Sequence, residues 1–136
     1  MSTDATTRPL PALTPETGFF WTSGADGRLR ILRCQSCRTY VHPPSPVCPS
    51  CGSRTLTPEP VSGHGTVLTA TVNHQEWGLL PTPYVIAIVE LEEQPGLRLT
   101  TNIVGIDPAE VRSGMPVQVR FEHDADVYLP VFEPVR

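Results

Sequence analysis

Four cysteines are the residues of this sequence whose type and spacing most clearly indicate chemistry. Cys34, Cys37, Cys48 and Cys51 form two C-x2-C pairs with ten residues between them. Each pair can form a tight turn that directs both sulfurs to one side, and four thiolates in tetrahedral geometry suit Zn²⁺. Because four protein ligands leave no coordination position for water, we predict one structural zinc ion that takes no part in catalysis.

Three other uses of the four cysteines can be compared with structural zinc. Two disulfides need an oxidising compartment, and the sequence shows neither the basic region nor the apolar stretch of a signal peptide. A redox C-x2-C motif does not need a second pair nearby. Iron bound as in rubredoxin would use the same four sulfurs, so the sequence alone leaves zinc and iron open.

A short helix that carries three consecutive aromatic residues is predicted over residues 14–27. Thr14 followed by proline is a typical helix start, and glycines close the segment. Successive helical residues lie about 100° apart, so Phe19, Phe20 and Trp21 cannot all face one side. We therefore expect these rings to form an interface with a partner chain, and packing on the chain's own core stays open as the alternative.

The rest of the sequence divides into a tail, a ribbon and a β domain. Residues 1–13 are polar, contain two prolines and show no periodicity, which is typical of a flexible tail. Residues 28–56 hold the cysteines and are predicted to form a rubredoxin-like zinc ribbon, whose first strand covers 28–33. Residues 57–136 are predicted to form a five-stranded OB-fold barrel, so the fold class is mostly β.

The barrel prediction rests on the order of its elements. A single helical turn at 107–110 falls between the third and fourth predicted strands, which is the order of an OB-fold, although the pattern also allows an SH3-like barrel. Pro130 in the last strand indicates an edge or a bulge. The strands are predicted at 66–73, 84–92, 97–104, 117–122 and 127–132.

Charge is distributed unevenly along the chain, whose net charge is −4. Residues 28–54 contain five arginines and no acid, whereas residues 55–136 contain four arginines and eleven acids. An OB-fold that binds single-stranded nucleic acid needs a basic groove, so the acidic barrel argues against this function. No apolar run is long enough to span a membrane, and we expect a cytoplasmic protein.

Several strings resemble a family of zinc-ribbon plus OB-fold proteins associated with acyl-CoA, long catalogued as a domain of unknown function. The resemblance extends from about residue 15 to the C-terminus. The strings include Gly18-Phe19-Phe20-Trp21, His42-Pro43-Pro44, Cys48-Pro49-Ser50-Cys51-Gly52-Ser53, Ser62-Gly63-His64-Gly65-Thr66-Val67, Asn102-Ile103-Val104-Gly105 and Gly114-Met115-Pro116-Val117.

This resemblance implies an accessory subunit that has no catalytic residues of its own. Such proteins bind thiolase-fold enzymes that act on acyl-CoA thioesters, among them thiolases and steroid side-chain aldolases, so a hetero-oligomer is implied. The resemblance also favours the OB-fold over the SH3-like barrel. The sequence itself contains no nucleophile motif and no phosphate-binding glycine loop. A single-strand nucleic-acid binder is the alternative function, and an independent CoA-thioester enzyme is a third.

Four further residues are candidates for contact with CoA or with the partner enzyme. Arg33 and Arg38 of the ribbon can offer guanidinium groups to phosphate oxygens, although they can equally compensate the thiolates. Trp77 and Leu79 lie in an apolar loop between the first two barrel strands, where OB-folds contact ligands. That loop can also fold back onto the barrel.

Overall fold

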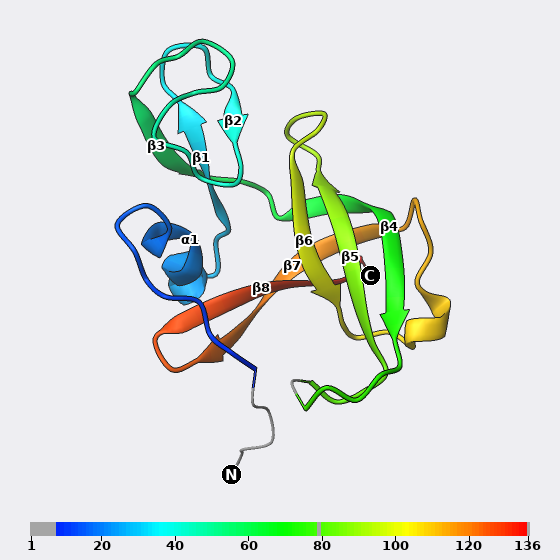
Figure 1. The fold of residues 1–136 in the computed structure, drawn as a ribbon. Helices are drawn as coiled ribbons and strands as arrows, with labels where there is room; N and C mark the ends of the chain where they lie inside the picture. The colour runs from blue at the N-terminus through cyan, green and yellow to red at the C-terminus, as the bar shows by residue number, and fades with distance from the viewer. Residues whose placement is uncertain (1–7, 79, 136) are drawn as a thin grey trace.

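The computed structural model describes residues 8–78 and 80–135, so residues 1–7, most of the predicted flexible tail, and Leu79 lie outside the described residues. The described residues form a three-stranded sheet, a short helix and a β-barrel. Figure 1 shows the small sheet and the barrel as separate parts, linked by short connections. The prediction of a mostly β protein with a ribbon and an OB-like barrel is confirmed. None of the helices in the described residues is long and apolar enough to cross a membrane.

The ribbon is an antiparallel sheet in the order β2-β1-β3, with β1 at Arg30–Cys34, β2 at Tyr40–Val41 and β3 at Leu56–Pro60. Because β3 pairs with β1 along its full length, the sheet of the ribbon continues past residue 56, where the ribbon was predicted to end. Its buried cluster consists of two apolar residues and two cysteines, namely Leu32, Val41, Cys34 and Cys48. So small a core cannot stabilise the ribbon without a further cross-link.

The barrel closes in the strand order β4-β5-β6-β8-β7. A 3-10 turn at Pro108–Glu110 precedes β7, and the Asp107 carboxylate caps it by accepting a hydrogen bond from the backbone N–H of Ala109 at 3.0 Å. Alternating β-branched residues place one face of each strand in the core. The strands are β4 (His64–Asn73), β5 (Tyr84–Leu91), β6 (Arg98–Ile103), β7 (Pro116–Asp124) and β8 (Val127–Pro134).

The barrel closes between β6 and β8 through a short parallel pairing. These strands pair only at Ile103 and Phe132, where the N–H of Val104 donates to the Phe132 carbonyl at 2.8 Å. Pro130, which lacks an N–H, lies in the part of β8 that does not pair with β6, and its carbonyl accepts from the Thr101 hydroxyl at 3.1 Å. The expectation of an edge position for this proline agrees with that arrangement.

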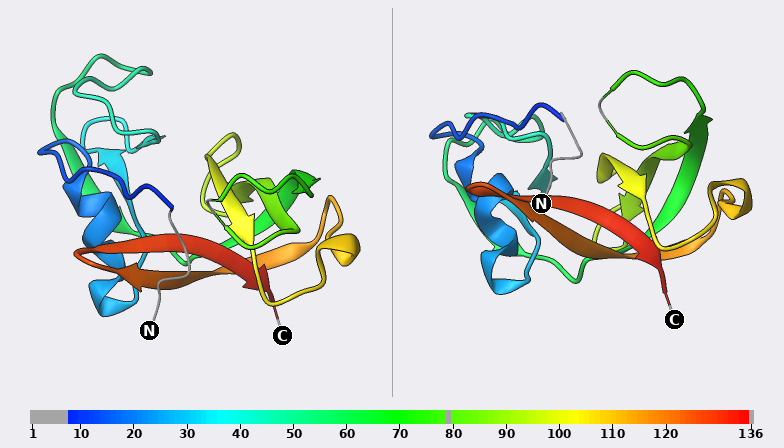
Figure 2. Two further views of the ribbon diagram at one scale, coloured as in Figure 1. Left: turned by 60° about the horizontal axis from the view of Figure 1, so that its bottom comes forward. Right: turned by 90° about the horizontal axis from the view of Figure 1, so that it is seen from below.

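The N-terminal helix packs against β8, and the β7–β8 hairpin reaches past the barrel to meet it (Figures 1 and 2). The α-helix, α1 (Gly18–Thr22), is shorter than the predicted 14–27. The Thr14 hydroxyl accepts from the Thr17 N–H at 3.1 Å in a preceding turn, and a 3-10 helix, η1 (Ser23–Asp26), follows. The helix stays short because glycine at positions 18 and 24 disfavours helical backbone.

Candidate metal centre and contact residues

The two C-x2-C pairs adopt the same turn. The Cys34 carbonyl accepts from the Arg38 N–H at 3.0 Å, and the Cys48 carbonyl accepts from the Gly52 N–H at 2.9 Å. Cys34 lies at the end of β1, and the second pair lies in the loop that returns to β3. Two equivalent turns that face each other bring both pairs of sulfurs to one point.

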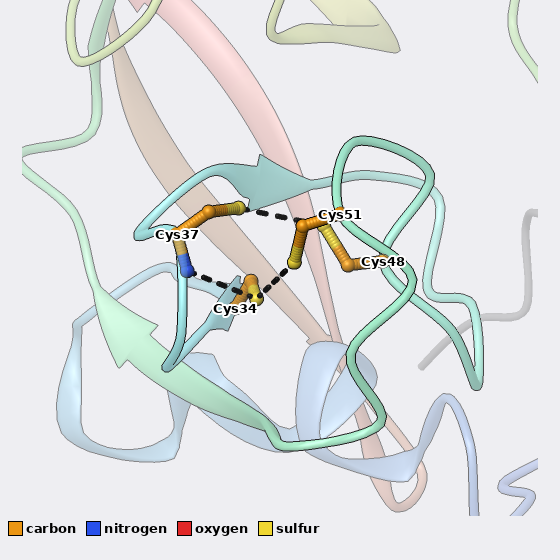
Figure 3. Close-up of side chains that lie close together, drawn as sticks. All are labelled: Cys34, Cys37, Cys48 and Cys51. Carbon is orange, nitrogen blue, oxygen red and sulfur yellow. Dashed lines mark hydrogen bonds between the residues drawn. The ribbon is translucent and has the colours of Figure 1, made fainter.

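All four sulfurs lie within 4.8 Å of one another and are directed inward (Figure 3). The Sγ atoms of Cys34 and Cys51 are 3.6 Å apart, and those of Cys37 and Cys48 are 3.7 Å apart. A tetrahedral zinc site with Zn–S bonds of about 2.3 Å has S···S edges of about 3.8 Å. The cysteine cage therefore has the size that a thiolate-bound zinc ion requires.

The pKa values of the cysteines are also consistent with a divalent metal ion bound between them. The backbone N–H of Cys37 and further hydrogen bonds lower the pKa of Cys34 to about 6. The N–H of Ser53 favours the Cys51 thiolate as well, but the neighbouring sulfurs, Cys34 first, together with burial, outweigh it and raise the pKa of Cys51 to about 11. Four thiolates cannot crowd together without a compensating cation, and a coordinated metal ion would deprotonate all of them.

The residue after each second cysteine has a left-handed backbone, with φ of 67° at Arg38 and 79° at Gly52. We predict that Gly52→Val lowers the free energy of unfolding by about 1–2 kcal/mol, because a β-branched residue is strained there. Apart from the adjoining residues, no atom of the described part of the chain lies within 4 Å of a Cβ added at this glycine, so the effect is a backbone effect and not a clash.

Thermal unfolding of the metal-loaded protein measures this change, with Gly52→Asn as the matched control. Asparagine tolerates left-handed backbone and should lose much less stability than valine. Equal melting temperatures for the valine variant and the wild type would show that this turn does not need its observed conformation.

Arg33 and Arg38 lie together on the ribbon and share one carboxylate, that of Glu59 in β3. Arg33 Nη1 is 3.3 Å from Glu59 Oε1, and Arg38 Nη2 is 3.2 Å from Glu59 Oε2. Hydrogen bonding from Gln35 and then from Arg33 lowers the pKa of Glu59, so the carboxylate stays charged. The arginines thus have an acidic partner within the chain, and their contact with CoA phosphates stays a prediction.

Trp77, in the loop between β4 and β5, is 63% exposed and has not folded back onto the barrel. Leu79, which was predicted with it, lies outside the described residues. The exposed Ile86 of β5 adds a second large apolar side chain to the barrel surface. A role of Trp77 in contacting CoA or a partner stays a prediction that its exposure favours.

The three aromatic residues of α1 do not share one environment. Phe20 is 6% exposed and belongs to the barrel core, so packing within the chain describes this ring better than the predicted partner interface. Phe19 is partly buried against both the barrel core and the ribbon cluster, and Trp21 is partly buried against the barrel core. The helix therefore joins the two cores, and partner contact by the exposed parts of Phe19 and Trp21 stays a prediction.

A cleft of about 380 Å³ opens where α1, the ribbon and the barrel meet. Periodicity in the sequence could not reveal it, because its walls come from four separate segments. The string His42-Pro43-Pro44 was the one available signal, and its role in the cleft was not recognised. The cleft is lined by Thr17, Phe20, Trp21, His42, Pro43, Pro44, Arg98, Leu99, Thr100 and Pro130.

Two family models match the chain in succession. Residues 21–57 match the model described as ChsH2, rubredoxin-like zinc ribbon domain. Residues 58–122 match the model described as ChsH2, C-terminal OB-fold domain. Together the two models cover most of the chain.

Curated relatives fall into two groups. The chain is 42% identical over 129 residues to a probable enoyl-CoA hydratase alpha subunit of Thermomonospora curvata, covering 93% of this chain and 40% of that protein. It is 36% identical to the 3-oxo-4,17-pregnadiene-20-carboxyl-CoA hydratase alpha subunit of Mycobacterium tuberculosis, of which it covers 39%. The chain thus spans about two fifths of the length of these hydratase subunits. A DUF35 domain-containing scaffold protein of Methanocaldococcus jannaschii is 39% identical over 105 residues, which are 70% of each chain.

Solved structures show the same arrangement of ribbon and barrel. A chain of the Ltp2-ChsH2(DUF35) aldolase matches with a TM-score of 0.83 and 40% identity, covering 92% of this chain and 98% of that one. A DUF35 protein of unknown function from Sulfolobus solfataricus matches with a TM-score of 0.64 at 15% identity, which shows the fold alone.

Proposed function

Because the chain belongs to the DUF35 family of ChsH2-type zinc-ribbon and OB-fold proteins, we propose that it is a non-catalytic accessory subunit of a thiolase-fold enzyme. The enzyme would act on acyl-CoA thioesters, as a thiolase or a steroid side-chain aldolase, and the chain would bind and activate or scaffold it. The likeness to almost the whole of one chain of the Ltp2-ChsH2(DUF35) aldolase carries this proposal. The relatives named scaffold protein and alpha subunit support a role in a hetero-oligomer.

We further propose that one zinc ion is bound by Cys34, Cys37, Cys48 and Cys51. The spacing of the sulfurs supports it, and so do the opposite shifts of the pKa values of Cys34, which is lowered, and Cys51, which is raised. The ion would supply a structural cross-link, since four thiolate ligands complete its coordination. Acyl-CoA would be bound at the interface that the chain and the enzyme share.

The geometry of the barrel supports a protein partner over single-stranded nucleic acid. OB-folds grip oligonucleotides on their second and third strands, here β5 and β6. On that side the described residues place Arg98 of β6, which is exposed, and Arg8, whose guanidinium donates to the Asn102 side chain and lies 3.7 Å from the Glu122 carboxylate. Arg8 is engaged within the chain, which leaves one exposed arginine there, while the β7–β8 turn carries Asp124 and Asp126, which repel phosphate.

Trp77→Ala is expected to weaken binding of the partner enzyme about ten-fold or more, because exposed tryptophans are typical interface anchors. Its melting temperature should stay close to that of the wild type, since the indole is 63% exposed. Calorimetric titration with the isolated Ltp2 component of the solved aldolase measures the binding, and Trp77→Phe is the control that retains an aromatic anchor. An unchanged Kd for the alanine variant would remove this loop from the interface.

A further inference from the structure

Arg8 lies where the barrel of an OB-fold binds its ligands. The ligand site of such barrels is formed by the second and third strands, the loop between strands one and two and the loop between strands four and five. In this chain these are β5, β6, the β4–β5 loop and the β7–β8 turn. A hollow of about 220 Å³ brings Arg8 together with Leu80 of the β4–β5 loop, Tyr84 of β5, Asn102 of β6 and Glu122 near the end of β7.

Two acceptors on different strands hold the guanidinium of Arg8. Its Nη2 donates to Asn102 Oδ1, and its Nη1 lies 3.7 Å from Glu122 Oε1. The barrel itself orients the first acceptor, because Asn102 Nδ2 donates to the Val85 carbonyl at 2.7 Å and the amide oxygen is thereby left to face Arg8. Glu122 has no other ion-pair partner among the described residues. This pair of acceptors matches the planar fork of a guanidinium better than the point charge of an ammonium.

The segment that carries Arg8 is a strap, defined here as residues 8–13, which passes over β8 toward the β4–β5 loop (Figures 1 and 2). Prolines at positions 9 and 11 fix φ and favour an extended chain. The Arg8 side chain is only 24% exposed, whereas Leu10 and Leu13 are among the exposed large apolar residues. The barrel therefore holds the strap mainly by its cation.

We propose that the ligand site of this OB-fold is a guanidinium site, which takes an arginine on a short proline-containing segment, and that Arg8 is its resident ligand. The negative charges of Asp124 and Asp126 in the adjoining hairpin favour a cation at this place and oppose a phosphate. Because a tethered ligand competes at an effective concentration of about 1 mM, the strap closes the site to other ligands that present a guanidinium. The proposal goes beyond the proposed function and depends neither on the metal nor on the partner enzyme.

A purely structural role of Arg8 predicts a different behaviour. The guanidinium joins β6 to β7, and the strand between them, β8, pairs with β6 only at Ile103 and Phe132. If Arg8 were only a clamp at this closure, its loss would lower stability without creating an affinity for any ligand. A site that Arg8 fills must instead bind an arginine peptide once Arg8 is removed.

Titration of the full-length Arg8→Ala variant with the blocked hexapeptide RPLPAL, the sequence of residues 8–13, tests the proposal. We expect saturable binding that shifts the NMR signals of the Asn102 side-chain amide and of the Glu122 backbone. The wild-type chain should bind the same peptide at least about ten-fold more weakly, because its own Arg8 competes. A peptide with lysine in place of the arginine should bind several-fold more weakly than RPLPAL, and one with alanine should not bind detectably.

Two further substitutions in the Arg8→Ala chain provide matched controls. Glu122→Gln removes the carboxylate that faces the guanidinium, and it should weaken binding of RPLPAL several-fold at low salt and less at high salt. Asp126→Asn removes a charge from the turn of the same hairpin but no acceptor of Arg8, so it should have a much smaller effect. Thermal unfolding of every variant separates loss of binding from loss of fold. If Arg8→Ala proves unstable, Arg8→Lys replaces it, with an expected peptide affinity between those of the alanine variant and the wild type.

Three results would overturn the guanidinium site. They are equal affinity for the arginine and alanine peptides, equal affinity of the wild-type and Arg8→Ala chains for RPLPAL, and failure of RPLPAL to bind either Arg8 variant. Each would leave Arg8 as a clamp between strands. Because no partner enzyme takes part in these titrations, their failure leaves the proposed function standing.

Discussion

Cys48→Ser is expected to unfold the ribbon and to abolish binding of the partner enzyme. Among the described residues, the ribbon's own buried cluster contains just two apolar residues besides its cysteines, Leu32 and Val41, since Ile31 of β1 is buried in the barrel core instead. Binding of structural zinc by such small modules supplies about 10–16 kcal/mol of folding free energy, most of which depends on a complete ligand set. Metal analysis should find substoichiometric zinc, and amide exchange should show loss of protection in β1 and β2 while the barrel stays protected.

Ser50→Ala is the matched control for this substitution, because it lies in the same turn and offers no ligand to the ion. It should retain one zinc per chain and full partner binding. The same metal analysis distinguishes zinc from iron, which the four sulfurs alone do not. If Cys48→Ser retained both ribbon protection and partner binding, the ion would not be the cross-link that the ribbon requires.

Gly24→Val is expected to lower the free energy of unfolding by about 3 kcal/mol. A Cβ at this position of η1 would lie 2.4 Å from Phe121 Cδ1 and 2.8 Å from Tyr128 Cβ, on the two strands of the β7–β8 hairpin. Neither atom is the far end of a flexible chain, so the helix or the hairpin must move. Denaturant unfolding measures the change.

Gly18→Val, in the preceding α1, is the matched control, since a Cβ there meets no atom of the described residues within 4 Å beyond its chain neighbours and its own helix backbone. It should change stability by well under 1 kcal/mol. Equal destabilisation by the two valines would show that the helix does not rest directly on the hairpin.

Much of the fold could be predicted from residue pattern because the barrel strands are rich in β-branched residues that alternate. The strand predicted at 117–122 is observed as β7, Pro116–Asp124, and the one predicted at 127–132 is β8, which continues to Pro134. The metal cage follows from spacing alone, since two C-x2-C pairs within one short segment have few other arrangements.

Other features depend on tertiary contacts that no local pattern records. β3 contains two prolines in five residues, which argues against a strand, yet it forms the edge of the ribbon sheet. With β3 unrecognised, the pairing of Glu59 with both ribbon arginines could not be foreseen. The cleft around His42 was likewise hidden, because four segments far apart in the chain form its walls.

Turnover of an acyl-CoA substrate by the isolated Ltp2 component of the solved aldolase, measured with and without this chain, tests the central claim most directly. We predict that the chain alone has no activity and that adding the metal-loaded chain to the enzyme raises the rate until the two are equimolar. Turnover by the purified chain alone, or a rate for the enzyme that the chain does not change, would contradict the assignment as an accessory subunit.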